Sequence, residues 1–306
     1  MKQFLNKIAV FFTLPLLCFL FLEWQVRTQE NSYSLKMHNF HEKKSGIEHL
    51  ILGNSHAYYG LNPAYFSGNT FNLANLSQSL DIDELLLNKN LADMNQLKTV
   101  ILPISTFSFD FTLSDSEESW RRYDYLFYSD LNKTDLSISS FDLRNWSLVL
   151  AKGFKSNMDI LLSLWKKGSL VNCSEKGWAN NYKGSALSKD TILVKNTAER
   201  HKAFQGHEFE NKNHLLKIIE NLQNRGVRLI LIHLPVSRSY FDYVDKESYS
   251  ITQAYLQGVT SKYPHVEYVD WMQKVGFDTN LFYDPDHLNQ VGAKKVSKLL
   301  DDYLKQ

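Results

Sequence analysis

The sequence predicts an α/β fold of three layers, in which helices cover both faces of a five-stranded parallel sheet. Short apolar runs alternate along the chain with longer segments whose apolar residues recur at helical spacing. Apolar strands that alternate with helices form parallel sheets covered on both faces. The 306 residues are 43% hydrophobic and 22% charged, a composition typical of a folded protein with a core.

The N-terminal residues form an apolar run outside this alternation. Residues 8–22 carry no charge, and Lys2 and Lys7 precede them. With its apolar flanks the run approaches the roughly 20 residues that cross a bilayer, and no cleavage pattern of small residues follows it. Residues 1–27 are therefore predicted to be an uncleaved single-pass anchor, with a cytoplasmic N-terminus and an extracytoplasmic body. A cleaved signal peptide and a buried core helix are the alternatives.

The polar residues 28–45 are predicted to be a tether to a body that spans residues 46–306. The first strand ends at Gly53, and Pro103 and Pro235 stop the third and fourth strands, since proline cannot donate to a strand ladder. The five predicted strands span residues 47–52, 70–73, 99–102, 227–234 and 266–269.

Four helices are predicted between and after these strands. Asp81 is a candidate N-cap, with Glu84 three residues later as in a capping box. The next helix has four apolar residues on one face and ends at Gly226. The predicted helices span residues 81–95, 210–225, 246–262 and 289–304.

Residues 108–207 interrupt the alternation and are too long for a plain loop, so they are predicted to form a mainly helical inserted cap. A helix is expected near residues 146–167. The segment holds four of the six tryptophans. These aromatic residues either build the core of a small subdomain or form a surface that stacks on sugars.

Composition and motif absences exclude several classes of function. The formal net charge of +1 gives no electrostatic footprint for nucleic acid. Cys18 and Cys173 form neither a disulfide framework nor a zinc motif. The sequence contains no phosphate-binding glycine motif. We therefore expect no cofactor, no metal and no nucleic-acid partner.

Two short segments carry candidate chemistry. The first is Gly-Asn-Ser-His at residues 53–56, directly after the first strand, which places Ser55 at the carboxyl edge of the sheet where ligands bind. The second is Asp-Pro-Asp-His-Leu-Asn at residues 284–289, before the last helix. A serine nucleophile needs a base, and a histidine base needs a carboxylate to orient it. We expect His287 to be the base and Asp284 to orient it. The alternative is a loop that only caps the last helix, through Asp286 or Asn289, with His287 as a surface residue.

These two segments resemble the first and last sequence blocks of the SGNH/GDSL hydrolase superfamily. The resemblance covers residues 47–107 and about 210–305, and it implies a flavodoxin-like sheet. The anchored body is most similar to envelope proteins of the teichoic-acid D-alanylation and alginate O-acetylation types. Asn54 stands where the superfamily usually has aspartate.

The superfamily also implies donors to an oxyanion hole. Ala74 or Asn75 occupies the place of its second block and would supply a backbone N–H. No asparagine follows the third strand, so Ser105 or Thr106 would have to donate, or the hole would rely on backbone N–H groups. His56 is expected to be structural or to face substrate, and Arg238 to bind an anionic group or to be a surface residue.

Three further histidines, His201, His207 and His214, have spacings unsuited to a metal pair on one helical face, and we expect them to be solvated. The predicted activity is that of a membrane-anchored serine esterase or O-acyltransferase. Its expected substrate is an acylated cell-envelope polysaccharide or a related polymer, and its expected partner is an envelope acyl-transfer complex. The alternative is a non-catalytic binding or assembly protein of a polysaccharide modification or export complex.

Overall fold

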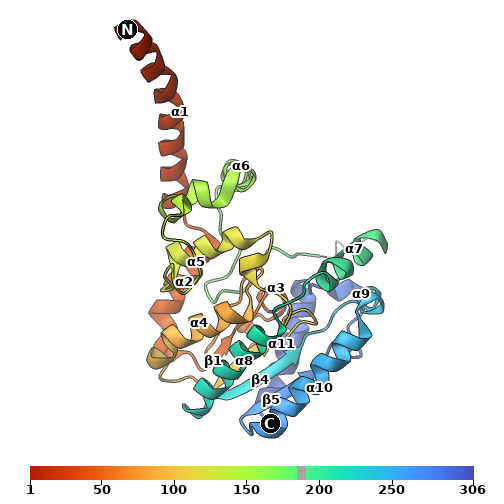
Figure 1. Cartoon of the computed structure of the whole chain (residues 1–306). Helices are drawn as coiled ribbons and strands as arrows, with labels where there is room; N and C mark the ends of the chain where they lie inside the picture. Colours follow the sequence, from red (N-terminus) through yellow and green to blue (C-terminus); the bar gives the residue numbers. More distant parts are fainter. Residues whose placement is uncertain (185–190) are drawn as a thin grey trace. The chain divides into compact units, whose positions relative to one another are not determined.

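The structure, a computed structural model, describes residues 1–184 and 191–306 (Figure 1). The chain divides into two compact units. Unit 1 comprises Met1–Leu35 and Ser119–Val171, and unit 2 comprises Lys36–Glu118 and Asn172–Gln306. The predicted cap at residues 108–207 thus contributes to both units, and its residues 185–190 lie outside the described residues.

Unit 2 contains a five-stranded sheet whose order is β2-β1-β3-β4-β5, and every neighbouring pair is parallel. The strands are β1 (His49–Ile51), β2 (Thr70–Asn72), β3 (Thr99–Pro103), β4 (Arg228–His233) and β5 (Val266–Asp270). All five coincide with predicted strands. With its flanking helices (Figure 1) the sheet confirms the predicted three-layer α/β fold.

The helices of unit 2 bury their apolar faces against the sheet and one another. Helix α4 packs against α8, and α3 packs against α11. They are α3 (Ser55–Gly60), α4 (Leu80–Asn90), α7 (Thr191–Lys202), α8 (Glu208–Gln223), α9 (Arg238–Tyr243), α10 (Lys246–Lys262) and α11 (Gln290–Leu304). Short 3₁₀ helices lie at Lys44–Gly46, Pro63–Tyr65, Leu91–Asp93, Leu113–Asp115 and Thr279–Leu281.

Two local features differ from the sequence prediction. The expected tether contains helix α2 (Ser32–Lys43), in which the side chain of Lys36 is fully buried. The capping-box prediction is wrong, because Ser79 is the N-cap residue of α4 and Glu84 contacts His214 instead. The burial of Lys36 depends on its contacts with the segment after β2, which no local pattern encodes.

Unit 1 contains α1 (Lys2–Thr28), α5 (Arg122–Tyr128), α6 (Leu148–Lys167) and 3₁₀ helices at Ser119–Arg121 and Leu143–Trp146. Within the described residues, α1 is the one helix long and apolar enough to cross a membrane, over Val10–Thr28. Helix α6 bends at Gly153, whose φ is 70°. Residues Val26, Leu148 and Val149 form a small buried cluster between α1 and α6.

The carboxylate of Glu23 on α1 caps the first turn of α6. It accepts hydrogen bonds from Ser147 Oγ at 2.7 Å and from the backbone N–H groups of Leu148 and Val149 at 3.1 Å. A carboxylate at a helix N-terminus satisfies free N–H groups and opposes the positive end of the helix dipole. The last turns of α1 are therefore part of the fold of unit 1.

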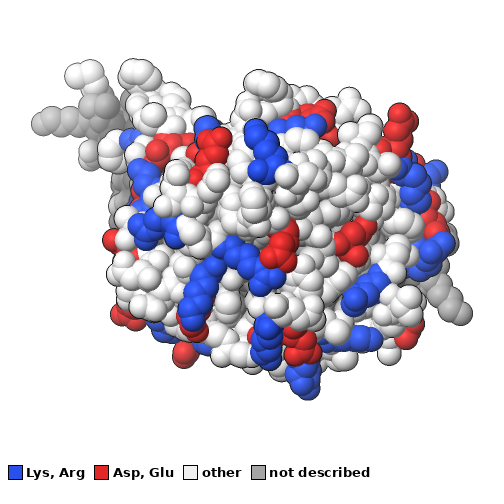
Figure 2. Space-filling view, turned by 90° about the horizontal axis from the view of Figure 1, so that it is seen from below, with Lys and Arg blue, Asp and Glu red and all other residues white. Residues whose placement is uncertain are grey.

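Charged side chains do not gather by sign on the face shown in Figure 2. Lysine and arginine alternate there with aspartate and glutamate across the surface. This intermixing agrees with a composition of 34 basic and 33 acidic residues.

Candidate active site

Ser55 follows β1 on a tight turn. Gly53 has a φ of 108°, a conformation that side chains rarely adopt, and a Cβ there would lie 3.4 Å from the carbonyl oxygen of Pro103. Asn54 is the N-cap residue of α3, and its side chain accepts a hydrogen bond from the N–H of His56 at 3.0 Å. The turn and the cap together fix Ser55 at the start of α3.

The His287 side chain lies within hydrogen-bond distance of both other predicted catalytic side chains, Ser55 and Asp284. Ser55 Oγ is 2.8 Å from His287 Nε2. Asp284 Oδ1 and Oδ2 are 2.9 and 3.0 Å from His287 Nδ1. A carboxylate on Nδ1 leaves Nε2 free to take a proton from the serine. This geometry allows Ser55 to be activated as a nucleophile.

The loop that carries His287 is fixed from several sides. The backbone N–H groups of Asp286 and His287 donate to Asp284 Oδ1 at 3.2 and 2.8 Å. Ser237 Oγ donates to the carbonyl oxygen of Pro285 at 2.6 Å. Asn289, rather than Asp286, caps α11. The loop therefore holds the imidazole without help from a ligand.

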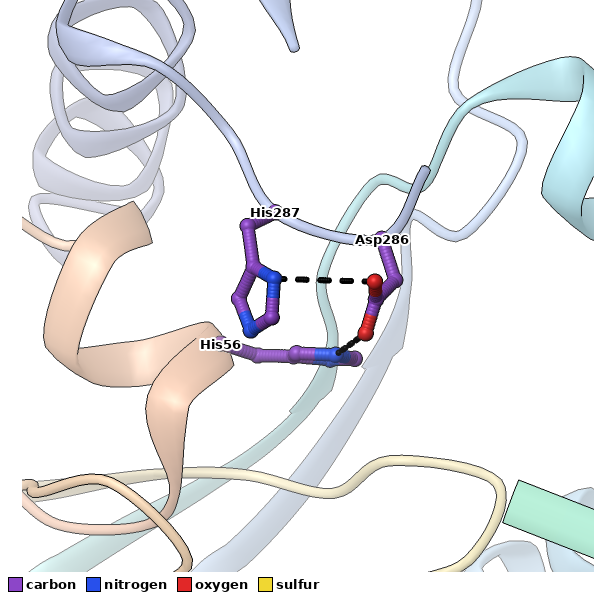
Figure 3. A group of neighbouring side chains, drawn as sticks. All are labelled: His56, Asp286 and His287. Atoms are coloured by element: carbon purple, nitrogen blue, oxygen red, sulfur yellow. Dashed lines mark hydrogen bonds and ion pairs between the residues drawn. The ribbon is translucent and has the colours of Figure 1, made fainter. Parts of the chain in front are cut away.

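Asp286 is a second carboxylate beside His287, and its buried side chain is surrounded by histidines (Figure 3). His56 Nε2 lies 3.1 Å from Asp286 Oδ2, and His201 Nε2 lies 3.9 Å from the same oxygen. His287 Nδ1 lies 3.5 Å from Oδ1. Burial alone would raise the pKa of Asp286, but the three histidines outweigh it and lower the pKa well below its usual range. Asp286 is therefore ionised.

A directional chain of hydrogen bonds leads to Asp286. Because Asn54 Oδ1 accepts from a backbone N–H, its Nδ2 donates to Ser105 Oγ at 3.0 Å. Ser105 Oγ lies 3.0 Å from His56 Nδ1. With His56 in its neutral form, Nδ1 accepts the hydrogen of Ser105 Oγ and Nε2–H donates to Asp286. Each of these contacts then has one donor and one acceptor. Ser105, a predicted oxyanion donor, is thus engaged with His56.

The two aspartates make His287 a stronger base. Burial lowers its pKa, but Asp286 and Asp284 outweigh burial and raise the pKa to about 9. The charges therefore stabilise the imidazolium that forms when Ser55 loses its proton.

The sequence analysis expected one orienting carboxylate beside His287 and a solvated His201. The expectation for His201 is wrong, because its side chain is buried, lies between Asp286 and Tyr240, and bonds the hydroxyl of Tyr240 at 2.6 Å.

The other predicted oxyanion donors are also hydrogen-bonded. The N–H of Ala74 donates to Asn72 Oδ1 at 3.0 Å, and the N–H of Asn75 donates to the carbonyl oxygen of Gly53 at 3.2 Å. The buried ammonium of Lys36 holds the same segment, since it donates to the carbonyl oxygen of Ala74 and to Asn75 Oδ1. The segment after β2 is therefore anchored directly beside the serine turn.

Arg238 is exposed at the start of α9 and pairs with Asp242 at 3.2 Å. Within the described residues, its contacts are with Asp242, Gln273 and Phe241 and not with the Ser55–His287–Asp284 group.

Three tyrosines that the sequence analysis did not single out stack near His287. The ring of Tyr182 lies between those of Tyr59 and Tyr283, with centroid distances of 3.6 and 3.9 Å.

His56, Asp286 and His287 could in principle hold a metal ion, because each offers a ligand atom within 4.8 Å of the others. Coordination through His287 Nδ1 would displace its hydrogen bonds to Asp284, and coordination through Nε2 would displace Ser55. A metal here and the intact Ser55–His287–Asp284 group are therefore mutually exclusive.

Comparisons with known proteins find limited similarity. One protein-family model matches residues 191–306, less than half of the chain. No curated protein matches the chain. Solved structures that match include a Streptococcus pneumoniae protein provisionally named a platelet activating factor, with 17% identity and a TM-score of 0.44, over 93% of this chain and 96% of that one.

Two further structures have names that refer to acyl chemistry. One is a Bacteroides fragilis protein provisionally named an acylhydrolase, with 9% identity and a TM-score of 0.42, over 90% of this chain and 98% of that one. The other is the C-terminal catalytic domain of the Streptococcus pneumoniae peptidoglycan O-acetyltransferase A, with 12% identity and a TM-score of 0.34, over 85% and 91%. Identities and TM-scores this low do not establish a family.

Proposed function

We propose that this protein is a serine esterase or O-acyltransferase of the SGNH type, with Ser55 as nucleophile, His287 as base and Asp284 as the orienting carboxylate. The observation that carries the proposal is the 2.8 Å contact between Ser55 Oγ and His287 Nε2, with Asp284 on the opposite ring nitrogen. Nucleophile, base and orienting group in hydrogen-bond reach are the signature of covalent acyl transfer.

The reaction follows from these positions. Ser55 Oγ attacks the carbonyl carbon of an ester while its proton passes to His287 Nε2. The tetrahedral intermediate collapses, the alcohol leaves with the proton from His287, and the acyl group stays on Ser55. Water or a sugar hydroxyl then gives its proton to His287 and takes the acyl group, and His287 returns this proton to Ser55 Oγ, so that the free enzyme is restored.

The oxyanion of the intermediate needs donors close to Ser55. In the part of the chain that the structure describes, the N–H of Ser55 makes no recorded hydrogen bond, and we assign it as one donor. The N–H of Asn75 is the nearest candidate for a second donor by position, and it would have to be released from the carbonyl of Gly53 when substrate binds. Substrate binding must therefore rearrange the segment after β2 before the N–H of Asn75 can act as a donor.

We further propose that α1 is an uncleaved membrane anchor and that unit 2 acts on an acylated polymer of the cell envelope. Support for retention of the anchor comes from Glu23, because cleavage after α1 would remove the carboxylate that caps α6. A membrane-bound site outside the cytoplasm fits a polymer substrate better than a soluble metabolite.

The engaged oxyanion donors favour a second candidate function. If the N–H groups of Ala74 and Asn75 stay bonded as they are, the protein would bind an acylated polymer within a modification or export complex without turnover. A non-catalytic protein of this kind keeps the scaffold and the anchor but lacks a competent oxyanion hole.

Fluorophosphonate labelling separates the two candidates. The full chain in membranes should be labelled, and the Ser55→Ala variant should not, because the reagent needs an activated serine. Ser261→Ala changes an exposed serine on α10, far from the triad in the sequence, and should leave labelling intact. A folded wild-type chain that resists the reagent would favour the non-catalytic function.

A further inference from the structure

Helix α6 of unit 1 carries an exposed apolar stripe. Phe154 and Trp165 are 83% and 82% exposed, and Met158 and Leu162 are 40% and 42% exposed. Their spacing of four, four and three residues places them on one face of the helix beyond the bend at Gly153. An apolar face of this kind, left in water, marks an interaction surface.

Basic residues flank the stripe. Lys155, Lys166 and Lys167 are exposed, and Asp159 is the one acidic residue of α6. At 3.6 residues per turn, Lys155 and Lys166 lie next to the stripe, at its polar edge. Aromatic and aliphatic residues on one face with lysines beside them are typical of helices that lie in the headgroup region of a membrane.

The same helix begins at the end of the candidate membrane span. Glu23 bonds the first turn of α6, and Phe19 and Leu22 of α1 pack against the cluster that contains Leu148 and Val149. In Figure 1, α6 runs away from the end of α1 rather than along it. If α1 crosses a bilayer, the start of α6 therefore lies at the membrane surface.

We propose that α6 lies in the membrane interface, with Phe154, Met158, Leu162 and Trp165 buried among lipids and the flanking lysines at the headgroups. The proposal rests on α1 as a membrane anchor. The part of α6 beyond Gly153, residues 154–167, corresponds to about 20 Å of helix, enough to give unit 1 a second, lateral contact with the bilayer. Anionic lipids would strengthen the contact, since four lysines accompany one aspartate on the helix.

The test measures the depth of nitroxide labels on the full chain in vesicles of phosphatidylcholine and phosphatidylglycerol. Cysteines introduced by Phe154→Cys and Trp165→Cys probe the stripe, and Asp159→Cys probes the polar face, each with Cys18→Ser. Cys173 is buried and stays in place. Since the three replaced residues are exposed, the labels should not disturb folding, and comparison of each melting temperature with that of the unlabelled chain checks this.

The labels at 154 and 165 should collide more often with oxygen than with a water-soluble nickel reagent, which corresponds to a depth of about 5–10 Å below the membrane surface. The label at 159 should show the reverse. Labels at 154 and 165 that meet the nickel reagent as often as the label at 159 would overturn the proposal. Labels shielded from both reagents would also overturn it, because a protein partner or a second copy would then cover the stripe.

Native Cys18 provides an internal control for the anchor. It is exposed on α1, inside the window that could cross a membrane. A label on Cys18 in the otherwise unchanged chain should lie deep in the bilayer. A deep Cys18 with a water-exposed stripe refutes the interfacial helix alone, whereas a water-exposed Cys18 refutes the anchor and the interfacial helix together.

Discussion

The two units of this protein handle apolar side chains in opposite ways. In unit 2, β3 and β4 are almost entirely buried, and exposed apolar residues are scattered one or two to an element. In unit 1, exposed apolar residues line α1 and recur along one face of α6. Unit 2 therefore buries most of its apolar side chains within its own fold, while unit 1 leaves two apolar helical surfaces exposed. This difference supports our proposals that unit 2 carries the chemistry and that unit 1 contacts a membrane.

The largest expected effect is confined to unit 2. Asp284→Asn should lower kcat by about 10⁴-fold while the melting temperature changes little, because the amide favours the wrong imidazole tautomer. Hydrolysis of a small soluble ester measures this. Trp165→Glu in unit 1 is the matched control and should leave kcat on the same ester unchanged. Near-normal turnover of Asp284→Asn would assign the orienting role to Asp286.

The contrast in burial predicts a contrast in stability. Leu231 is fully buried in β4, so Leu231→Ala should lower the free energy of unfolding by about 2–5 kcal/mol. Phe154→Ala removes a larger side chain from an exposed position and should change it by less than about 0.5 kcal/mol in detergent. Denaturant titration compares the two. Equal losses would mean that the stripe on α6 is part of a protein core.

Asp286 should set the pH dependence within unit 2. The neutral form of His287 is the base, so kcat/KM should rise with pH through a midpoint near the His287 pKa of about 9. Asp286→Asn removes a charge that raises this pKa, and the midpoint should move towards the ordinary histidine value. The maximal rate should fall about tenfold or more, the equivalent of one lost charged interaction.

A pair of variants at His56 controls this experiment. His56→Gln can keep a donor where Nε2 bonds Asp286, whereas His56→Asn is too short to reach it. The glutamine variant should therefore retain more activity than the asparagine variant. Profiles of Asp286→Asn and wild type that coincide would show that Asp284 alone tunes the base.

The smallest expected effect is in unit 1. Glu23→Gln weakens the cap on α6, because an amide is neutral and accepts with one oxygen only. The loss should be about 1 kcal/mol, as for other N-cap changes, and hydrogen exchange at Leu148 and Val149 should become faster. Unchanged exchange at both amides would mean that α1 does not hold the start of α6.

Local patterns predicted the features that are encoded locally. The strands are short, mainly apolar runs with glycine or proline at or near their ends. Ser55 lies in a short motif directly after the first run, and Asp284 and His287 lie in one directly before the last helix. Features that depend on distant partners escaped prediction. The burial of Lys36 requires the segment after β2, and the burial of His201 requires Asp286 and Tyr240. The contact between Asp286 and His56 was not predicted, since nothing local reveals it.

The most direct test of the proposed chemistry is to locate the covalent adduct. The full chain, labelled with a fluorophosphonate in membranes and digested, should yield one modified peptide with the adduct on Ser55, and His287→Ala should abolish it. An adduct on another serine, or labelling of Ser55 that persists without His287, would contradict an acyl transfer driven by this serine–histidine pair.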